Sequence, residues 1–136
     1  MPVVLTAEKT FVVGNELVLE GASPRAGLAA VFEDDGNTGY FYAVDMSDLD
    51  NPIQDTLHIY NVQGVTDRHI PSKAQIVWSA EGTRAALLIN GYPHAAFDFA
   101  GKRGYCRTGF PPHGVAGKWP QPSHAWDDAA TDWLRR

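Results

Sequence analysis

Apolar and polar residues alternate with a period of two along most of the chain, a pattern typical of half-buried β-strands. Between residues 75 and 110, Asn90-Gly91, a strong signal for a tight hairpin turn, separates two predicted strands. We therefore expect an antiparallel meander in this part of the chain. The pattern predicts strands over residues 9–13, 16–20, 28–33, 40–45, 56–62, 75–79, 84–90, 94–99 and 104–110.

The alternation also assigns an inward face to several of these strands, because successive side chains of a strand point to opposite sides of the sheet. The positions expected to face the core are Leu17, Leu19, Ile76, Trp78, Ala85, Leu87, Ile89, Ala95, Phe97 and Phe99.

The end of the chain follows a different pattern. Residues 111–122 contain four prolines and two glycines, so we expect an irregular, extended arm lying over the sheet. Apolar residues then recur at spacings of three and four, which predicts an amphipathic helix over residues 123–136 with Ser123 as its N-cap. This helix should cover one open end or one face of the sheet. Its apolar positions are Trp126, Ala129, Ala130, Trp133 and Leu134.

These patterns predict a mainly β protein, an antiparallel sheet folded as a sandwich or an open barrel, with one C-terminal amphipathic helix. A chain of 136 residues fits a single domain, and a hydrophobic content of 44% argues against disorder. Within that domain we expect a β core over residues 1–110, the proline-rich arm over 111–122 and the helix over 123–136.

Cys106 is the single cysteine, so an intramolecular disulfide and a cysteine metal cluster are both excluded. The first residues lack a signal-peptide pattern, and no apolar stretch approaches the roughly 20 residues that span a bilayer. We therefore expect a cytoplasmic protein that does not associate with membranes. No pattern in the sequence indicates a cofactor.

Charge is distributed unevenly along the chain, whose formal net charge is −5. Between Arg25 and Arg68 lie eight carboxylates and no Lys or Arg, whereas residues 99–126 hold four Lys or Arg and no carboxylate. An acidic surface attracts cationic partners and disfavours nucleic-acid phosphates. The eight acidic residues are Glu33, Asp34, Asp35, Asp45, Asp48, Asp50, Asp55 and Asp67.

Tyrosines accompany these carboxylates, and Tyr40 and Tyr42 share a face of one predicted strand. Aromatic side chains dominate the contact energy of protein interfaces. We therefore predict a non-enzymatic protein-binding module with a basic protein as its partner; one concrete version is an immunity-type inhibitor of a basic toxin. The predicted partner-binding residues are Asp34, Asp35, Tyr40, Tyr42, Asp45, Asp48, Asp50 and Tyr60.

The acidic residues do not predict a metal site. A calcium loop of the EF-hand type needs a turn glycine and a terminal Glu, whereas Leu49 and Pro52 interrupt the acidic stretch. We expect a solvated acidic loop and no bound metal.

One alternative is a small enzyme or ligand-binding protein. Cys106 would be its nucleophile, with His94 on an adjacent strand and Arg107 nearby to favour the thiolate. The ordinary explanation for Cys106 is a buried small apolar residue, and the ordinary explanation for His94 is a surface or hydrogen-bonded residue of the sheet.

A second alternative is a single-strand nucleic-acid binder. In the basic segment, residues 102–119, the aromatic residues Tyr105, Phe110 and Trp119 interleave with cations, as base stacking would require. Internal pairing of these cations with the acidic half of the chain is the simpler explanation.

Four strings of the sequence resemble a small bacterial family that is described only as a domain of unknown function. The resemblance spans roughly residues 13–119 and implies a bacterial origin and a stand-alone domain, but no activity. The strings are Tyr40-Phe41-Tyr42-Ala43-Val44-Asp45, Leu57-His58-Ile59-Tyr60-Asn61-Val62, Asn90-Gly91-Tyr92-Pro93-His94-Ala95 and Tyr105-Cys106-Arg107-Thr108-Gly109-Phe110-Pro111.

Overall fold

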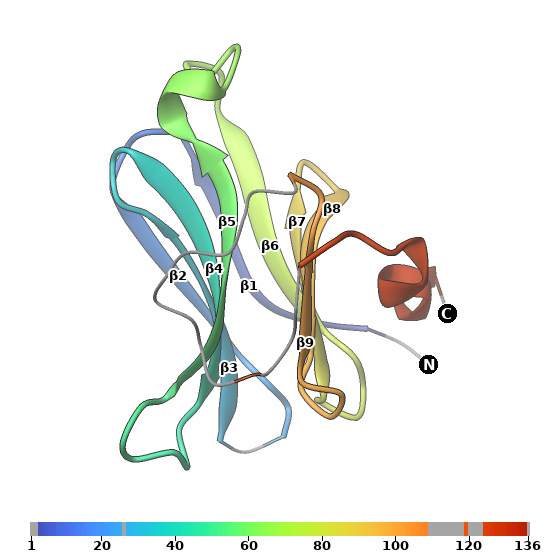
Figure 1. Ribbon diagram of the computed structural model, residues 1–136. Coiled ribbons are helices and arrows are strands. Elements are labelled where there is room, and N and C mark those ends of the chain that lie inside the picture. Colours follow the sequence, from blue (N-terminus) through green and yellow to red (C-terminus); the bar gives the residue numbers. More distant parts are fainter. Residues whose placement is uncertain (1–2, 26, 109–118, 120–123, 136) are drawn as a thin grey trace.

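A computed structural model describes residues 3–25, 27–108, 119 and 124–135. Two antiparallel sheets pack face to face (Figure 1), one of five strands in the order β1-β6-β7-β8-β9 and one of four in the order β2-β3-β4-β5. The strands are β1 (Val4–Phe11), β2 (Leu17–Ala22), β3 (Leu28–Asp34), β4 (Thr38–Asp45), β5 (Ile53–Asn61), β6 (Ser72–Trp78), β7 (Arg84–Ile89), β8 (Tyr92–Asp98) and β9 (Arg103–Cys106). Short 3-10 helices, η1 (Val62–Gly64) and η2 (Asp128–Arg135), complete the described elements.

The mainly β prediction and the predicted meander are confirmed, since β6 to β9 pair in chain order. Several boundaries differ from the prediction. The first strand starts at Val4 rather than at residue 9, and the last ends at Cys106. Gly14, whose φ is +95°, lies where the chain crosses from one sheet to the other, so β1 and β2 are not hydrogen-bonded neighbours.

The core lies between the two sheets and consists of the inward positions of both. Phe41 and Phe97 stack across it with ring centroids 4.9 Å apart, and the Trp78 indole donates to the Gly21 carbonyl at 3.1 Å. Each fully buried side chain of this size contributes about 1.5–3 kcal/mol. The ten inward positions expected from the sequence all lie in the core or pack against it.

Part of the outer face of the five-stranded sheet is covered by η2, as Figure 1 shows. Trp133 and Leu134 pack over Val77, Ala86 and Ala96, and the two alanines allow the helix to approach closely. The amphipathic pattern therefore predicted the right contact. The helix is of the 3-10 type and begins at Asp128, five residues later than predicted; Ser123 and nearly all of the predicted arm, except Trp119, lie outside the described residues.

Strand β5 carries two irregularities that determine which side chains enter the sandwich. Its pairing with β4 shifts between Gly39 and Tyr40 and again between Ala43 and Val44. A bulge gives one strand an extra residue and changes which face the following side chains occupy. Ile59 is buried on the same face as Leu57, and after the shift Tyr60 also turns inward, beside Phe32 at 6.2 Å between ring centroids.

A buried ion pair occupies the seam between β5 and β9. The His124 Nε2 atom lies 3.0 and 3.1 Å from the two carboxylate oxygens of Asp55, and both side chains are almost fully buried. The His124 carbonyl accepts a bond from the Cys106 amide, so the chain beside it pairs with the edge of β9. Gly104 leaves the room this pair needs, because a Cβ there would overlap the Asp55 carboxylate.

Replacing His124 by Ala should lower the free energy of unfolding by about 3 kcal/mol, because the buried Asp55 carboxylate would lose its two contacts with the imidazole. Urea denaturation monitored by tryptophan fluorescence measures this change. His69→Ala, at an exposed histidine, is the matched control and should change stability by less than about 0.5 kcal/mol. Equal stability of the two variants would contradict a structural role for the ion pair.

Candidate functional site

The acidic residues of the first half do not form one patch. Glu33, Asp34 and Asp35 lie at the turn between β3 and β4, whereas Asp45, Asp48 and Asp50 lie in the loop after β4. These two ends of β4 are roughly 23 Å apart, because an extended strand rises about 3.3 Å per residue. The charge that is continuous in sequence is therefore divided between opposite ends of the four-stranded sheet.

Asp34 is a structural residue, with 1% of its surface exposed. Its carboxylate accepts hydrogen bonds from the amides of Gly14 and Gly36, both at 2.8 Å, and from the Tyr60 hydroxyl at 2.7 Å. The Tyr60 ring lies over Gly39, where a Cβ would come within 2.7 Å of it. Both Asp34 and Tyr60 were predicted partner-binding residues, and their inward placement removes them from the partner surface that we propose below.

Tyr40 and Tyr42 lie together on the outer face of β4, as their spacing predicts. Their rings stack with centroids 5.9 Å apart, and His58 on β5 continues the row at 5.8 Å from Tyr40. The Tyr42 hydroxyl donates to Glu33 at 2.7 Å. Burial, this hydrogen bond and the Glu33 charge raise the pKa of Tyr42, so the ring remains a neutral donor at physiological pH.

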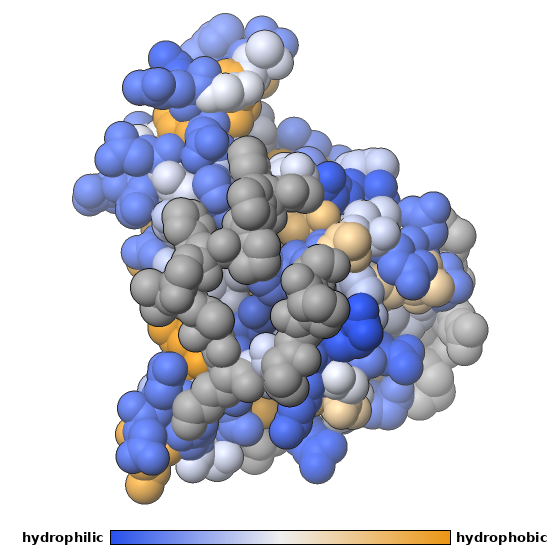
Figure 2. Space-filling view, in the orientation of Figure 1, coloured by the Kyte–Doolittle hydropathy of each residue, from blue (hydrophilic) through white to orange (hydrophobic). Residues whose placement is uncertain are grey.

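The loop between β4 and β5, residues 45–53, combines exposed apolar side chains with carboxylates; we call it the acidic loop. Leu49 at its tip is 91% exposed, and Met46 and Ile53 are also exposed. Figure 2 shows hydrophobic surface among hydrophilic residues in the lower left lobe that this loop forms. Sequence reasoning named the aspartates but missed these apolar residues, although a leucine between two aspartates outside any strand was the available signal.

Hydrogen bonds hold the acidic loop in one conformation. Asp45 accepts from the Ser47 amide at 3.0 Å, and Asp48 accepts from the Asn51 amide and the Gln54 side chain, both at 3.2 Å. Asp50 is exposed and has no hydrogen-bond partner among the described residues. At the other end of the sheet, the amides of Asn37 and Thr38 lower the pKa of Asp35.

The alternative site of Cys106, His94 and Arg107 falls on strand β8 and at the end of β9, where the register places Ala95 rather than His94 opposite Cys106. The Cys106 thiol is buried and lies 3.3 Å from the His58 carbonyl and 3.0 Å from the Thr108 hydroxyl. Arg107 lies between the rings of Tyr92 and Trp126, at 4.4 and 4.0 Å, and donates from Nε to the Pro93 carbonyl. The guanidinium is therefore held by contacts of its own.

The basic segment is only partly described. Trp119 is 7% exposed and packs edge-on against Phe97 and Phe99, so its ring is not free to stack on a base. Between described residues, one ion pair connects the two oppositely charged segments, that of His124 with Asp55.

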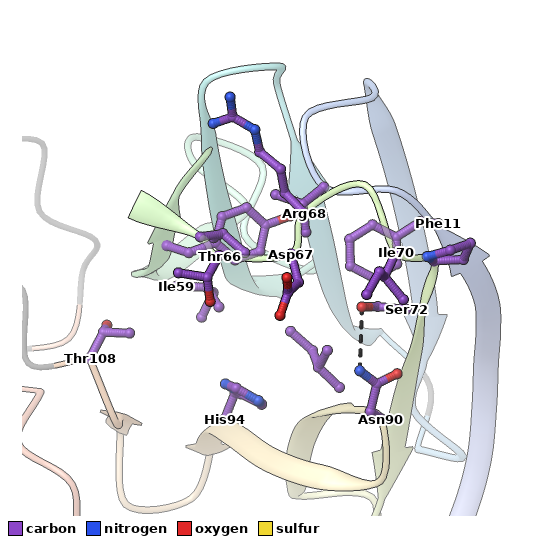
Figure 3. A pocket seen from close by; sticks show the side chains of 15 residues that line it. Phe11, Ile59, Thr66, Asp67, Arg68, Ile70, Ser72, Asn90, His94 and Thr108 are labelled. Carbon is purple, nitrogen blue, oxygen red and sulfur yellow. Dashed lines mark hydrogen bonds between the residues drawn. The ribbon is translucent and has the colours of Figure 1, made fainter. Parts of the chain in front are cut away.

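A pocket of about 410 Å³ opens at the end of the sandwich opposite the acidic loop (Figure 3). Its wall is largely apolar, and Asp67, His94 and Thr108 contribute polar groups. Burial, and secondarily the charge of Arg107, lowers the pKa of His94, so its imidazole is neutral at pH 7. An apolar pocket with a few convergent polar groups is the usual form of a small-ligand site.

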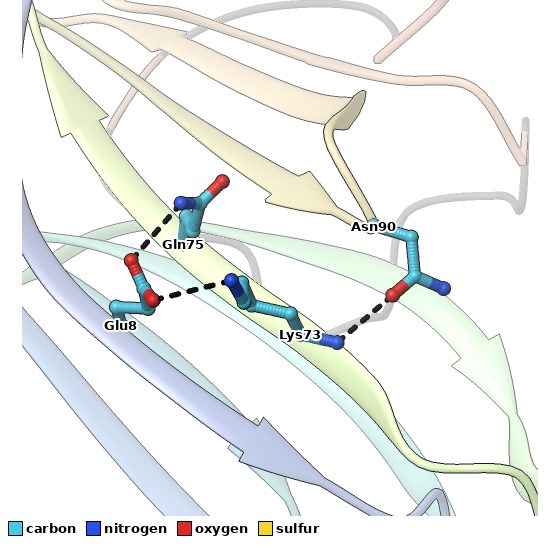
Figure 4. Close-up of polar contacts among 4 residues, drawn as sticks. All are labelled: Glu8, Lys73, Gln75 and Asn90. Carbon is cyan, nitrogen blue, oxygen red and sulfur yellow. Dashed lines mark hydrogen bonds and ion pairs between the residues drawn. The ribbon is translucent and has the colours of Figure 1, made fainter.

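Asn90 connects this pocket to the outer face of the five-stranded sheet (Figure 4). Its Oδ1 accepts from the Lys73 amide at 2.9 Å, and the Lys73 ammonium lies 3.5 Å from Glu8. The Gln75 amide and Lys73 both lower the pKa of Glu8. The cluster is exposed, so its contribution to stability is small, but it fixes the Asn90 turn at the rim of the pocket.

Across the described ranges, no group of three or more His, Cys, Asp or Glu side chains could hold a metal ion. Nor does that part of the chain contain a helix with the length and apolar character needed to cross a bilayer.

Asp34→Ala should lower the free energy of unfolding by about 2–4 kcal/mol, because two partly buried amides and a tyrosine hydroxyl would lose their acceptor. Asp50→Ala, an exposed aspartate of the same segment, should change it by less than about 0.5 kcal/mol. Urea midpoints measured under identical conditions distinguish them. A similarly small change for Asp34→Ala would contradict the structural role of this carboxylate.

The stability of the protein should fall as the pH rises above about 10, the pKa of an unperturbed tyrosine. Burial, and then the Asp34 contact, raises the pKa of Tyr60 in the folded protein, so the unfolded chain loses this proton first. Stability is therefore greatest below the unfolded pKa and decreases above it. Tyr60→Phe should show a smaller decrease between pH 8 and pH 11 in urea midpoints; an equal decrease would contradict this assignment.

Comparison with known proteins identifies the relatives of the chain. The model of a family described as an uncharacterized protein conserved in bacteria, DUF2251, matches residues 11–135. An uncharacterized protein of Haemophilus influenzae is 45% identical over 107 residues, which are 79% of this chain and 66% of that protein. The matched segment thus spans slightly less than two thirds of this relative. No solved structure is detectably similar. The resemblance noted in the sequence is confirmed, and the chain belongs to the bacterial family DUF2251.

Proposed function

We propose that this protein is a non-enzymatic binding module that recognises a basic protein through the acidic loop and the adjoining outer face of β4. The observation that carries this proposal is the exposure of Leu49 between Asp48 and Asp50 at the tip of that loop. Burial of an exposed leucine in an interface stabilises the complex. Because internal hydrogen bonds already hold this loop, less conformational entropy is lost when it binds.

The chemistry around Leu49 indicates what the partner must provide. Asp50 and the other loop carboxylates favour a cationic rim, while Leu49, Met46 and Ile53 favour an apolar recess inside it. Tyr42 extends the surface along β4, roughly 10 Å from Asp45 by strand geometry. Charge complementarity of this kind chiefly accelerates association and selects among partners. Inhibition of a basic toxin, in the manner of immunity proteins, is the most specific version of this proposal.

The buried state of Cys106 and the separate contacts of Arg107 favour this proposal over a nucleophilic enzyme. A reactive thiol needs solvent access and a stabilised thiolate. The buried Trp119 likewise disfavours stacking of single-stranded nucleic acid on the basic segment.

The proposal is tested by affinity capture from the native host with four single variants. Leu49→Ser and Asp50→Lys alter the acidic loop, while Leu5→Ser and Asp132→Lys make the same changes at exposed positions of the five-stranded sheet and of η2. All four lie at exposed sites, where substitutions usually change stability by less than about 0.5 kcal/mol.

For a captured basic protein, Leu49→Ser should weaken binding by about tenfold or more, mainly through faster dissociation. Asp50→Lys should slow association and reduce its dependence on salt. Leu5→Ser and Asp132→Lys should match the unmodified protein within about twofold. Surface plasmon resonance at two ionic strengths measures these rates. Equal binding by all four variants, or binding indifferent to salt, would exclude the acidic loop as the contact surface.

A further inference from the structure

The pocket at the far end of the sandwich is a second site, separate from the acidic loop. Its volume of about 410 Å³ lies within the range of small-molecule sites. The inner wall comes from the sandwich itself, through Phe11, Ile59 and Ile89. The segment between η1 and β6 forms the opposite wall and contributes Ile70, which is 53% exposed although it is strongly apolar. The site is therefore an apolar recess with an apolar rim.

Most polar side chains of this pocket already have partners. The Thr108 hydroxyl donates to the His58 carbonyl at 2.8 Å, and the Asn90 amide donates to Ser72 at 3.3 Å. Arg68 donates to the Val62 carbonyl at 3.2 Å, and Figure 3 shows its guanidinium extending away from the centre of the pocket. These groups shape the site, but their hydrogen bonds are made within the protein.

Among the ionisable side chains that line the pocket, Asp67 and His94 differ from Tyr60 and Arg68, which donate hydrogen bonds within the fold. Neither side chain has a hydrogen-bond partner in the part of the chain that the structure describes, and in Figure 3 the Asp67 carboxylate points into the pocket on the side of His94. No buried side-chain nitrogen or oxygen among the described residues lacks a partner, so the His94 nitrogens must be reachable by solvent or a ligand. Two ionisable side chains that have no hydrogen-bond partner among the described residues therefore face an apolar recess.

The backbone holds Asp67 in place. Its φ is +54°, in the left-handed region that Asp and Asn tolerate better than most residues, and its carbonyl accepts a bond from the Ile70 amide at 2.9 Å. The carboxylate therefore projects from a defined turn.

We propose that this pocket binds a small primary amine with an aromatic or branched aliphatic body. The ammonium group pairs with Asp67 and lies within reach of the neutral His94 ring, while the body packs against Phe11, Ile59 and Ile89. A carboxylate ligand is disfavoured because Asp67 would repel it, and Arg68, whose guanidinium points elsewhere, offers no compensating partner.

Three ligands that share a phenyl body but differ in their head group test this proposal: 2-phenylethylamine, 2-phenylethanol and phenylacetate. Each is titrated into the ¹⁵N-labelled full chain at pH 7 and followed by the amide resonances of Ile70, Asn90 and His94. The amine should shift these resonances with a dissociation constant on the order of 1 mM, as is usual for a ligand of this size. The alcohol should bind at least fivefold more weakly, and phenylacetate most weakly.

Asp67→Asn separates the charge from the shape of the site, because Asn tolerates the same backbone conformation. The variant should bind amine and alcohol with equal affinity while retaining the affinity of the unmodified protein for the alcohol. Asp50→Asn, at the other end of the molecule, should keep the preference for the amine. The proposal is overturned if phenylacetate binds as well as the amine, if no ligand shifts these resonances at 20 mM, or if Asp67→Asn retains the preference.

Discussion

The architecture depends on one buried carboxylate, that of Asp34. It accepts hydrogen bonds from Gly14, where the chain crosses between the sheets, from Gly36 in the β3–β4 turn, and from Tyr60 on β5. A carboxylate removed from water is tolerated only when donors replace its hydration, so the fold must bring these three segments together around Asp34. The inward position of Tyr60, which forms part of the pocket wall, follows from the same requirement.

The strands themselves could be predicted because the information is local. Leu17 and Leu19 alternate with the exposed residues Val18 and Glu20, and burial of one face follows directly from that period. The bulge near Ile59 could not be predicted in this way, since a strict period of two places Tyr60 on the same face as His58. The burial of Asp34 and Asp55 also escaped prediction, because carboxylates are almost always exposed unless a partner distant in sequence satisfies them.

The prediction of the candidate site from the sequence was limited in the same way, because contacts between distant residues were not visible in it. Charge counted along the sequence indicated one acidic region, but folding buries two of its eight carboxylates and divides most of the others between the ends of β4. Tyr40 and Tyr42 were placed correctly because their relation depends only on strand geometry. The pocket around Asp67 and His94 unites residues from β1, β5, β7, β8 and the segment before β6, and no spacing in the sequence anticipates such a convergence.

The division of surfaces in this fold explains why recognition is expected at its ends. The facing sides of both sheets form the core, and η2 occupies part of the outer face of the five-stranded sheet. Among the described residues, the loops, the outer face of the four-stranded sheet and the uncovered part of the five-stranded sheet therefore carry the chemistry available to a partner or ligand. Loops can bear exposed apolar groups such as Leu49 and Ile70 without disturbing the core, because the strands that anchor them are held by long-range packing.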